Sequence, residues 1–176
     1  SAIGQSINLV DWTGTRTAYP GGNNAWGLDA ANSAFGSPNV YWFMNSGGAT
    51  LTHTTINGTF NAGDVFQVTL DLFQNGGASA AANVTPTITF NTTETHTFGT
   101  ATVSAVSTVL NYSSAGYTLL APATGVTLTL AFSTGISGAQ TLMDNVTLTV
   151  TPVPEPTTFA LAGLGLAWLL IFRRRR

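Results

Sequence analysis

Acid, base and metal-ligand chemistry in this chain of 176 residues can come from few side chains, because cysteine is absent and histidine occurs only twice. His53 and His96 both lie in threonine-rich segments, where a solvent-facing or hydrogen-bonded strand residue is the expected role. Glu94 and His96 share a strand face, but a metal site needs a third ligand and a glycosidase needs a carboxylate pair about 5 to 10 Å apart. No such set stands out among the carboxylates that precede the proline-rich ending, which are Asp11, Asp29, Asp64, Asp71, Glu94 and Asp144. The sequence therefore predicts a protein that is not an enzyme.

Charge is scarce and unevenly placed along the chain. Charged residues make up 7% of the sequence, lysine is absent, and the acids upstream of Pro152 face Arg16 alone. The hydrated surface must therefore consist mainly of threonine, serine, asparagine and glycine, which suits an extracellular protein. A domain with so little positive charge cannot neutralise phosphates, so we expect no binding to nucleic acid.

Alternating apolar and polar residues predict short β-strands over most of residues 1–151. In addition to the segments that contain the interior residues named below, candidate strands begin at Ser6, Val40, Ala49, Thr85, Glu94 and Ala101. Pro86 is expected to place its own strand at a sheet edge. This pattern predicts an all-β domain, an antiparallel β-sandwich of jelly-roll-like type. The predicted interior consists of Phe66, Val68, Leu70, Leu72, Val126, Leu128, Leu130, Val146 and Leu148.

The last 25 residues differ from everything upstream. A proline-rich linker spans 152–158, an uninterrupted apolar run spans 159–172, and a cluster of arginines spans 173–176. Fourteen helical residues cover roughly 21 Å, so the run predicts one short transmembrane helix. The positive-inside rule keeps the cluster cytoplasmic as a stop-transfer signal and leaves residues 1–155 on the opposite face of the membrane. This cluster consists of Arg173, Arg174, Arg175 and Arg176.

The ending resembles the PEP-CTERM sorting signal of Gram-negative bacteria, over residues 153–176 only. In that family the signal is read by exosortase, a multi-pass membrane protease and transpeptidase-like enzyme, typically in bacteria that make exopolysaccharide. Gly163 and Ala167 are candidates for close docking of an enzyme helix. The alternative is a plain type I membrane anchor with a proline-rich collar. The sorting motif itself is Val153, Pro154, Glu155 and Pro156.

A second resemblance links the body of the chain to the jelly rolls of carbohydrate-binding modules and galactose-binding-like families. It rests on the stretches INLVDW, FNAGDVFQVTLDL and MDNVTLTV. Trp12, Trp26 and Trp42 are candidate glycan-stacking residues, and Trp12 and Trp26 are expected in loops; the alternative is that these rings fill the core. The resembled class often holds one calcium ion where the first and last strands meet, which makes Asp11 and Asp144 candidate ligands. Alternatively, both carboxylates satisfy local backbone donors.

Together these features predict an exosortase substrate held in the inner membrane with its N-terminal domain in the periplasm. Processing would then release the domain to the cell surface or the exopolysaccharide matrix, where it would serve as a structural or adhesive protein. The alternative function is a carbohydrate-binding module with a defined glycan ligand. Structural calcium is the one cofactor that the sequence brings forward.

Overall fold

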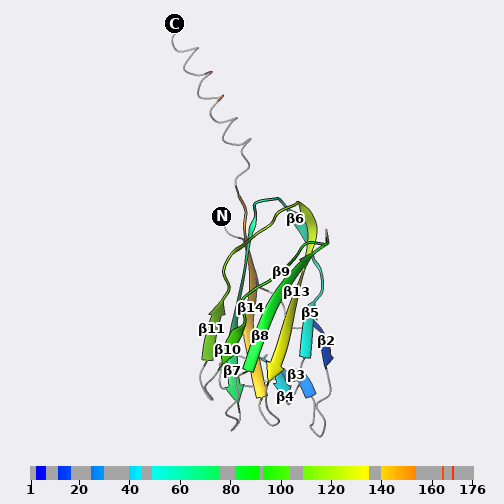
Figure 1. Ribbon diagram of the computed structural model, residues 1–176, viewed down its shortest axis with the longest axis vertical. Helices are drawn as coiled ribbons and strands as arrows, with labels where there is room; N and C mark the ends of the chain where they lie inside the picture. The colour runs from blue at the N-terminus through cyan, green and yellow to red at the C-terminus, as the bar shows by residue number, and fades with distance from the viewer. Residues whose placement is uncertain are drawn as a thin grey trace.

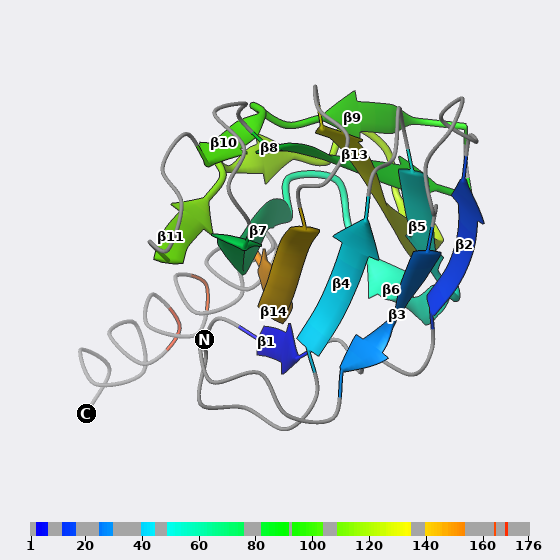
Figure 2. The same ribbon diagram turned by 90° about the horizontal axis from the view of Figure 1, so that it is seen from below.

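The computed structural model describes residues 3–6, 12–16, 25–29, 40–44, 49–75, 82–91, 93–103, 109–134 and 140–153, together with Leu164 and Trp168. The strands of these residues form two antiparallel sheets that stack face to face, as Figure 1 and Figure 2 show. The predicted all-β sandwich is confirmed.

The first sheet has the strand order β11-β7-β14-β4-β3, with β1 paired to β14 and β12 paired to β7. Its strands are β1 (Ile3–Ser6), β3 (Ala25–Asp29), β4 (Val40–Met44), β7 (Val65–Asn75), β11 (Val109–Ser113), β12 (Tyr117–Thr118) and β14 (Gln140–Thr151). The second sheet has the order β10-β8-β13-β5-β2, with β6 paired to β13 and β9 paired to β8. Its strands are β2 (Trp12–Arg16), β5 (Ala49–His53), β6 (Ile56–Phe60), β8 (Ala82–Phe90), β9 (Thr95–Thr97), β10 (Ala101–Val103) and β13 (Ala123–Thr134).

The core lies between the sheets where the sequence predicts it. Every predicted interior residue is at most 1% exposed. The alternation of β7 places Phe66, Val68, Leu70 and Leu72 inward, and the Phe66 ring meets the Phe90 ring of the other sheet edge-to-face at 4.9 Å. Burial of these side chains holds the two sheets together.

The prediction that Pro86 marks an edge strand is wrong, because β8 lies between β13 on one side and β9 and β10 on the other. The Pro86 carbonyl accepts a hydrogen bond from Phe98 N, which lies in the break between β9 and β10. A residue of an antiparallel strand directs its nitrogen and its carbonyl to the same side, so the missing N–H of Pro86 faces this break. An inner strand therefore accommodates the proline where its neighbour is interrupted.

The segment from Ala101 onward also differs from the expectation of one strand. It contains β10 (Ala101–Val103) in the second sheet and β11 (Val109–Ser113) in the first, so the chain changes sheets within it.

Few residues of the C-terminal segment are described. Leu164 and Trp168 are helical and exposed. Among the residues that the structure describes, no helix has the length and hydropathy that a bilayer crossing requires. The transmembrane helix at 159–172 stays a prediction.

Candidate functional site

The chain leaves the sandwich at a point where a buried carboxylate holds it. β14 ends at Thr151, which pairs with Val65 at the start of β7. Two residues later, Val153 N donates a hydrogen bond to Asp64 Oδ1 at 3.2 Å. Asp64 is only 4% exposed. The first residue of the sorting motif is thus bound to the folded domain.

A tight turn at residues 61–64, here named the exit turn, presents this carboxylate. Asp64 N donates to the Asn61 carbonyl at 3.1 Å, and Asn61 N donates to Asp64 Oδ2 at 2.8 Å. Gly63 adopts φ +98°, a conformation that favours glycine. Gly63 N donates to the Leu119 carbonyl and Leu119 N donates to the Asp64 carbonyl, each at 2.8 Å. Nothing in the sequence indicated that the Asp64 carboxylate would reach the sorting motif.

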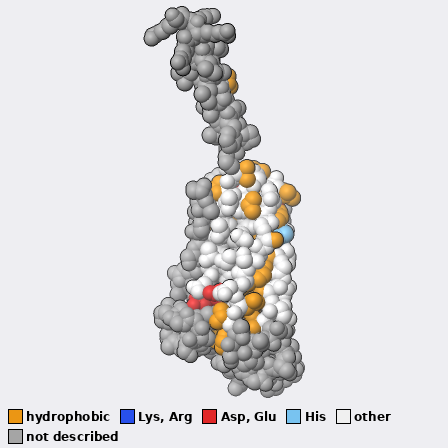
Figure 3. Space-filling model, turned by 90° about the vertical axis from the view of Figure 1, so that its left-hand side faces the viewer, with side chains coloured by type: hydrophobic (Ala, Val, Ile, Leu, Met, Phe, Trp, Pro, Cys, Tyr) orange, Lys and Arg blue, Asp and Glu red, His pale blue; other side chains and the backbone are white. Residues whose placement is uncertain are grey.

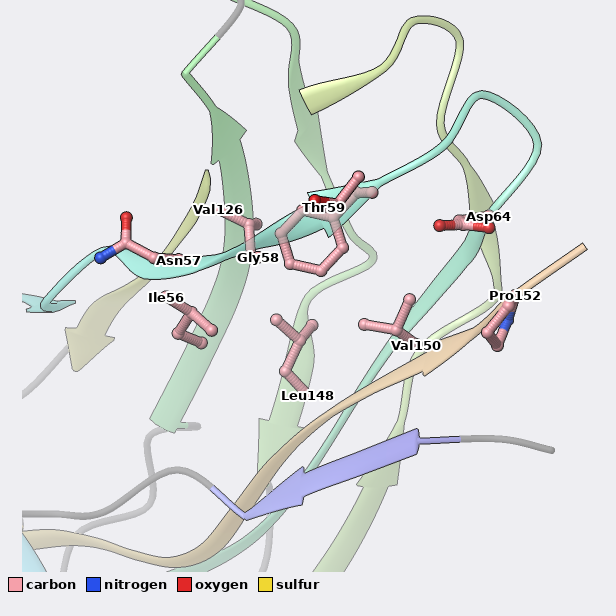
Figure 4. A pocket seen from close by; sticks show the side chains of 10 residues that line it. Ile56, Asn57, Gly58, Thr59, Asp64, Val126, Leu148, Val150 and Pro152 are labelled. Atoms are coloured by element: carbon pink, nitrogen blue, oxygen red, sulfur yellow. The ribbon is translucent and has the colours of Figure 1, made fainter. Parts of the chain in front are cut away.

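A cavity of about 200 Å³ lies beside the exit turn, between β6 and β14 (Figure 4). In Figure 4, Leu148 and Val150 point from β14 toward β6, and the Asp64 carboxylate lies at one end of the cavity. Both oxygens of that carboxylate already accept backbone N–H groups. The cavity is lined by Ile56, Asn57, Gly58, Thr59, Phe60, Asp64, Val126, Leu148, Val150 and Pro152. Its walls are therefore mainly apolar, without a free charged group.

A second cluster of polar and aromatic side chains closes one edge of the sandwich. His96 lies in β9 of the second sheet, Glu94 directly precedes that strand, and Tyr117 reaches both from β12 of the first sheet. The Tyr117 ring stacks on His96 with centroids 4.0 Å apart, and its hydroxyl donates to Glu94 Oε1. Leu120 N donates to the same oxygen at 3.0 Å. Figure 3 shows an apolar band along an edge of the sandwich with a histidine at its margin.

The electrostatics of this edge cluster stabilise one protonation state. Burial, together with the neighbouring Glu94 carboxylate, raises the pKa of Tyr117 to about 12. The hydrogen bond from Tyr117 lowers the pKa of Glu94 below its ordinary value. At neutral pH the phenol therefore stays protonated and donates to the ionised Glu94 carboxylate. The sequence placed Glu94 and His96 together but gave no signal for Tyr117, which lies in the other sheet.

A third cluster surrounds Asp144, one of the two candidate calcium ligands. Asp144 pairs with Asp71 across β14 and β7, next to a shift in register. Asn145, at φ 51°, bridges the two carboxylates: its backbone N donates to Asp144 Oδ1 and its Nδ2 donates to Asp71 Oδ2, each at 2.8 Å. Asp144 is 4% exposed, and its Oδ2 has no hydrogen-bond partner among the described residues.

One of these features favours a calcium ion at Asp144, and another favours the alternative role of binding local backbone. The bond from Asn145 to Oδ1 matches the local backbone role that the sequence left open, whereas the buried Oδ2 suits an oxygen-preferring cation. Within the described ranges no group of three His, Cys, Asp or Glu side chains could hold a metal ion. Asp11 lies outside the described residues.

The tryptophans do not occupy the loops that the sequence predicted. Trp12 begins β2, belongs to the core and is 6% exposed, so its prediction as a loop residue is wrong and the core-filling alternative holds. Its ring meets His53 at 5.2 Å, and His53 Nδ1 donates to the Thr54 carbonyl at 2.7 Å. Trp26 lies within β3 and therefore not in a loop either. Trp42 lies in β4, as the candidate strand at Val40 predicted.

The strand register gives the neighbours of the two remaining tryptophan positions. Position 42 pairs with Gly27 and with Leu142, which is fully buried, and position 26 pairs with Phe43. Trp26 and Trp42 stay predicted glycan-stacking residues.

Most of the sorting segment lies outside the described residues. This holds for three of the four motif residues, for the candidate docking positions in the apolar run and for the whole arginine cluster. These residues are Pro154, Glu155, Pro156, Gly163, Ala167, Arg173, Arg174, Arg175 and Arg176.

Comparison with protein families identifies the ending. The PEP-CTERM protein-sorting motif matches residues 152–176, which confirms the resemblance. Such a motif implies an exported, membrane-anchored protein that an exosortase processes. A search of curated proteins found no match to the chain.

Solved structures share the fold of the body. The CBM22-1 xylan-binding domain from Paenibacillus barcinonensis Xyn10C aligns with a TM-score of 0.54 and 12% identity, over 86% of this chain and 95% of that one. A cyclase from Fischerella sp. TAU aligns with a TM-score of 0.55 and 14% identity, over 86% and 90%. The enzymatically active domain of bacteriophage CBA120 tailspike protein 4 aligns with a TM-score of 0.54 and 16% identity, over 82% of this chain but only 20% of that one.

At these identities the similarities concern the fold alone, and they confirm the resemblance to carbohydrate-binding-module sandwiches at that level.

Proposed function

We propose that the chain is an exosortase substrate that delivers a β-sandwich to the cell surface or the exopolysaccharide matrix, where the domain has a structural or adhesive role. The observation that carries this proposal is the order of the parts. The last strand ends at Thr151, and the match to the PEP-CTERM family begins with the next residue, Pro152. The motif is therefore attached directly to a folded domain that it can export.

The proposed topology divides the chain into four parts. Residues 1–151 are the exported domain, 152–158 the linker with the motif, 159–172 the transmembrane helix and 173–176 the cytoplasmic arginines. Before processing, the helix holds the domain on the periplasmic side of the inner membrane. Charged side chains at the bilayer centre cost about 2.5 to 3.5 kcal/mol each on insertion scales, so four arginines oppose passage of the tail.

Two variants separate recognition from topology, in a host with and without exosortase. Glu155→Ala should keep the topology but remove recognition, so that the full-length chain accumulates in the inner membrane. Replacing all four arginines with serine should let the short helix slip, which gives unprocessed or misoriented protein. Intact-mass measurement and membrane fractionation distinguish these outcomes. A wild-type chain that keeps its arginines in the presence of the enzyme would show an ordinary anchor instead.

Carbohydrate binding is the second candidate function. It is supported by the fold shared with a domain described as xylan-binding. Trp12 is no longer a candidate for glycan stacking, because its side chain is buried. Binding on a glycan array should be lost in Trp42→Ala or Trp26→Ala and retained in Leu120→Ala, which truncates a residue that is 76% exposed. Binding that survives both tryptophan changes would contradict a stacking role for these rings.

Calcium remains part of the proposal as a structural ion held by Asp11 and Asp144. It would join the start and the end of the domain through oxygen ligands, as hard cations prefer. The buried Oδ2 of Asp144, which has no hydrogen-bond partner among the residues that the structure describes, supports it.

A further inference from the structure

The sandwich holds the chain two residues beyond its last strand. β14 ends at Thr151, yet Val153 N still donates to Asp64 Oδ1 at 3.2 Å. The Val153 side chain also lies against the exit turn, 3.6 Å from the position that a Cβ on Gly63 would take. Val153 is therefore tied to the domain through its backbone, while its side chain lies beside the exit turn and is 45% exposed.

Bonds that do not involve Val153 fix the exit turn in place. Gly63 N donates to the Leu119 carbonyl and Leu119 N donates to the Asp64 carbonyl. Asp64 Oδ2 accepts Asn61 N, so the carboxylate cannot rotate away without breaking a bond inside the turn. The acceptor for Val153 is thus preorganised and buried, which strengthens a charge-assisted hydrogen bond.

This attachment limits which part of the sorting motif an enzyme can reach. A protease that binds its substrate as an extended strand pairs with free backbone groups, and the Val153 amide is already paired. Pro154 has no N–H and restricts Val153 to extended backbone. Five residues, 154–158, separate Val153 from the apolar run at Phe159, a span of at most roughly 18 Å. The enzyme must therefore work with the folded domain close beside it.

We propose that the exit turn sets the upstream limit of exosortase processing, so that the enzyme binds the motif from Pro154 onward and the released domain keeps Val153. This inference rests on the proposed processing by exosortase. In that step a peptide bond beyond Val153 breaks: the carbonyl carbon on the domain side joins water or an acceptor amine, and the nitrogen on the tail side leaves as an amine with the proton. Asp64 acts through Val153 and determines specificity without contacting the reacting atoms.

The position of the cut in Asp64→Asn tests this role. The amide keeps the size of the side chain but loses one acceptor oxygen. Asp71→Asn is the matched control, because Asp71 lies on β7 and also accepts two donors, from Asn111 and Asn145, neither of which belongs to the motif. Each full-length chain is exported in a host that contains exosortase, and the C-terminus of the product is read by intact mass.

Wild type and the control should give product that ends at Val153 or beyond it. Loss of the charged acceptor should raise the fraction of chains in which the Val153 hydrogen bond is open about 10- to 100-fold, with a similar gain in product that ends upstream of Val153. Simple destabilisation would lower the yield of product but would not move the cut.

A second pair of variants keeps the test decisive if Asp64→Asn fails to fold. Asn61→Pro removes the N–H that holds Asp64 Oδ2 and leaves Val153 and the motif unchanged, whereas Asn61→Ala keeps this N–H. We expect Asn61→Pro to shift the cut upstream and Asn61→Ala to be cut as in wild type.

Wild-type product that lacks Val153, or an unchanged cut in both Asp64→Asn and Asn61→Pro, would overturn the inference while processing itself stands. A wild-type chain that is never processed would overturn the proposed function and this inference with it.

Discussion

Asp64 and Asp144 are both 4% exposed and both lie along the seam between β7 and β14, but their surroundings differ. Asp64 uses both oxygens, one for Asn61 N and one for Val153 N. Asp144 uses one oxygen for Asn145 N, and its Oδ2 has no partner in the described part of the chain. A buried carboxylate is therefore not by itself the sign of a binding site. An acceptor that the fold leaves unpaired carries more information.

The difference follows from what the chain brings to each carboxylate. Asp64 receives the next covalent segment of its own sheet, because the end of β14 passes directly beside it. Asp144 lies next to a register shift, where Asn145 takes a positive φ and divides its donors between Asp144 and Asp71. Asp64 thus completes the fold at the exit, and Asp144 leaves one oxygen for another partner.

Truncation of the core between these two regions should have the largest effect. Leu70 is 1% exposed, and it lies on β7 between Asp64 and Asp71. Leu70→Ala should lower the free energy of unfolding by about 2 to 5 kcal/mol, through lost burial and the cavity left behind. Urea denaturation followed by circular dichroism measures this loss. A change within error would mean that β7 does not anchor both regions.

The next largest effect should come from replacing each of the two carboxylates with alanine, and the loss of stability should differ between them. Asp64→Ala leaves two backbone N–H groups without their charged acceptor and should cost about 2 to 4 kcal/mol. Asp144→Ala removes one such bond together with an unpaired buried oxygen, so we expect a loss below about 1 kcal/mol in the absence of calcium. The same urea denaturation, run with a chelator, compares the two variants. Equal losses would contradict the distinction between a satisfied and an unsatisfied carboxylate.

Calcium should reveal a further difference, because only a change at its own ligand should abolish the stabilisation that it gives. If Asp144 holds the ion, calcium at 100 times its Kd should stabilise the wild type by about 2.7 kcal/mol and raise its Tm. Asp144→Asn should lose this gain, whereas Asp71→Asn should retain most of it, since Asp71 already accepts two side-chain donors. Magnesium at the same ionic strength controls for screening by salt. A wild-type Tm that calcium leaves unchanged would contradict the proposed ion.

The sequence predicted the fold well because alternation is a local signal. Phe66, Val68, Leu70 and Leu72 could be assigned to one face from spacing alone, and all are buried. Pro86 was misplaced because its tolerance depends on a break in the neighbouring strand, which is a property of the pairing and not of the segment around the proline.

The sites were less predictable, because each joins residues that are distant in sequence. Asp64 and Val153 are 89 residues apart, and Glu94 and Tyr117 are 23 residues apart. Trp12 was read as a loop residue among glycines and polar neighbours, yet it pairs with His53 and enters the core. Only the sorting motif is contiguous, and it was recognised from the sequence.

A third carboxylate, Glu94, extends the comparison to a partly exposed site and should give the smallest effect. Tyr117→Phe keeps the ring that stacks on His96 but removes the hydrogen bond to Glu94. Solvent screens an exposed pair, so the loss at neutral pH should be below about 1 kcal/mol. The effect of Tyr117→Phe should therefore be recognised by the pH dependence of the unfolding free energy, because the loss at neutral pH is small.

The signs of this dependence follow from the two pKa shifts. The folded pKa of Glu94 lies below its ordinary 4.5, so its contribution is present above pH 4.5 and is lost as the pH falls through the folded pKa. The pKa of Tyr117 is raised from 10.0 to about 12, so its contribution is full below pH 10 and is lost as the pH rises toward 12. Tyr117→Phe should weaken both limbs of a plot of unfolding free energy against pH. Tyr112→Phe, which loses a bond to the neutral Gly99 carbonyl, should leave the acid limb intact. If both variants change the acid limb equally, that limb does not come from Glu94, and the hydrogen bond across this edge contributes nothing specific to stability.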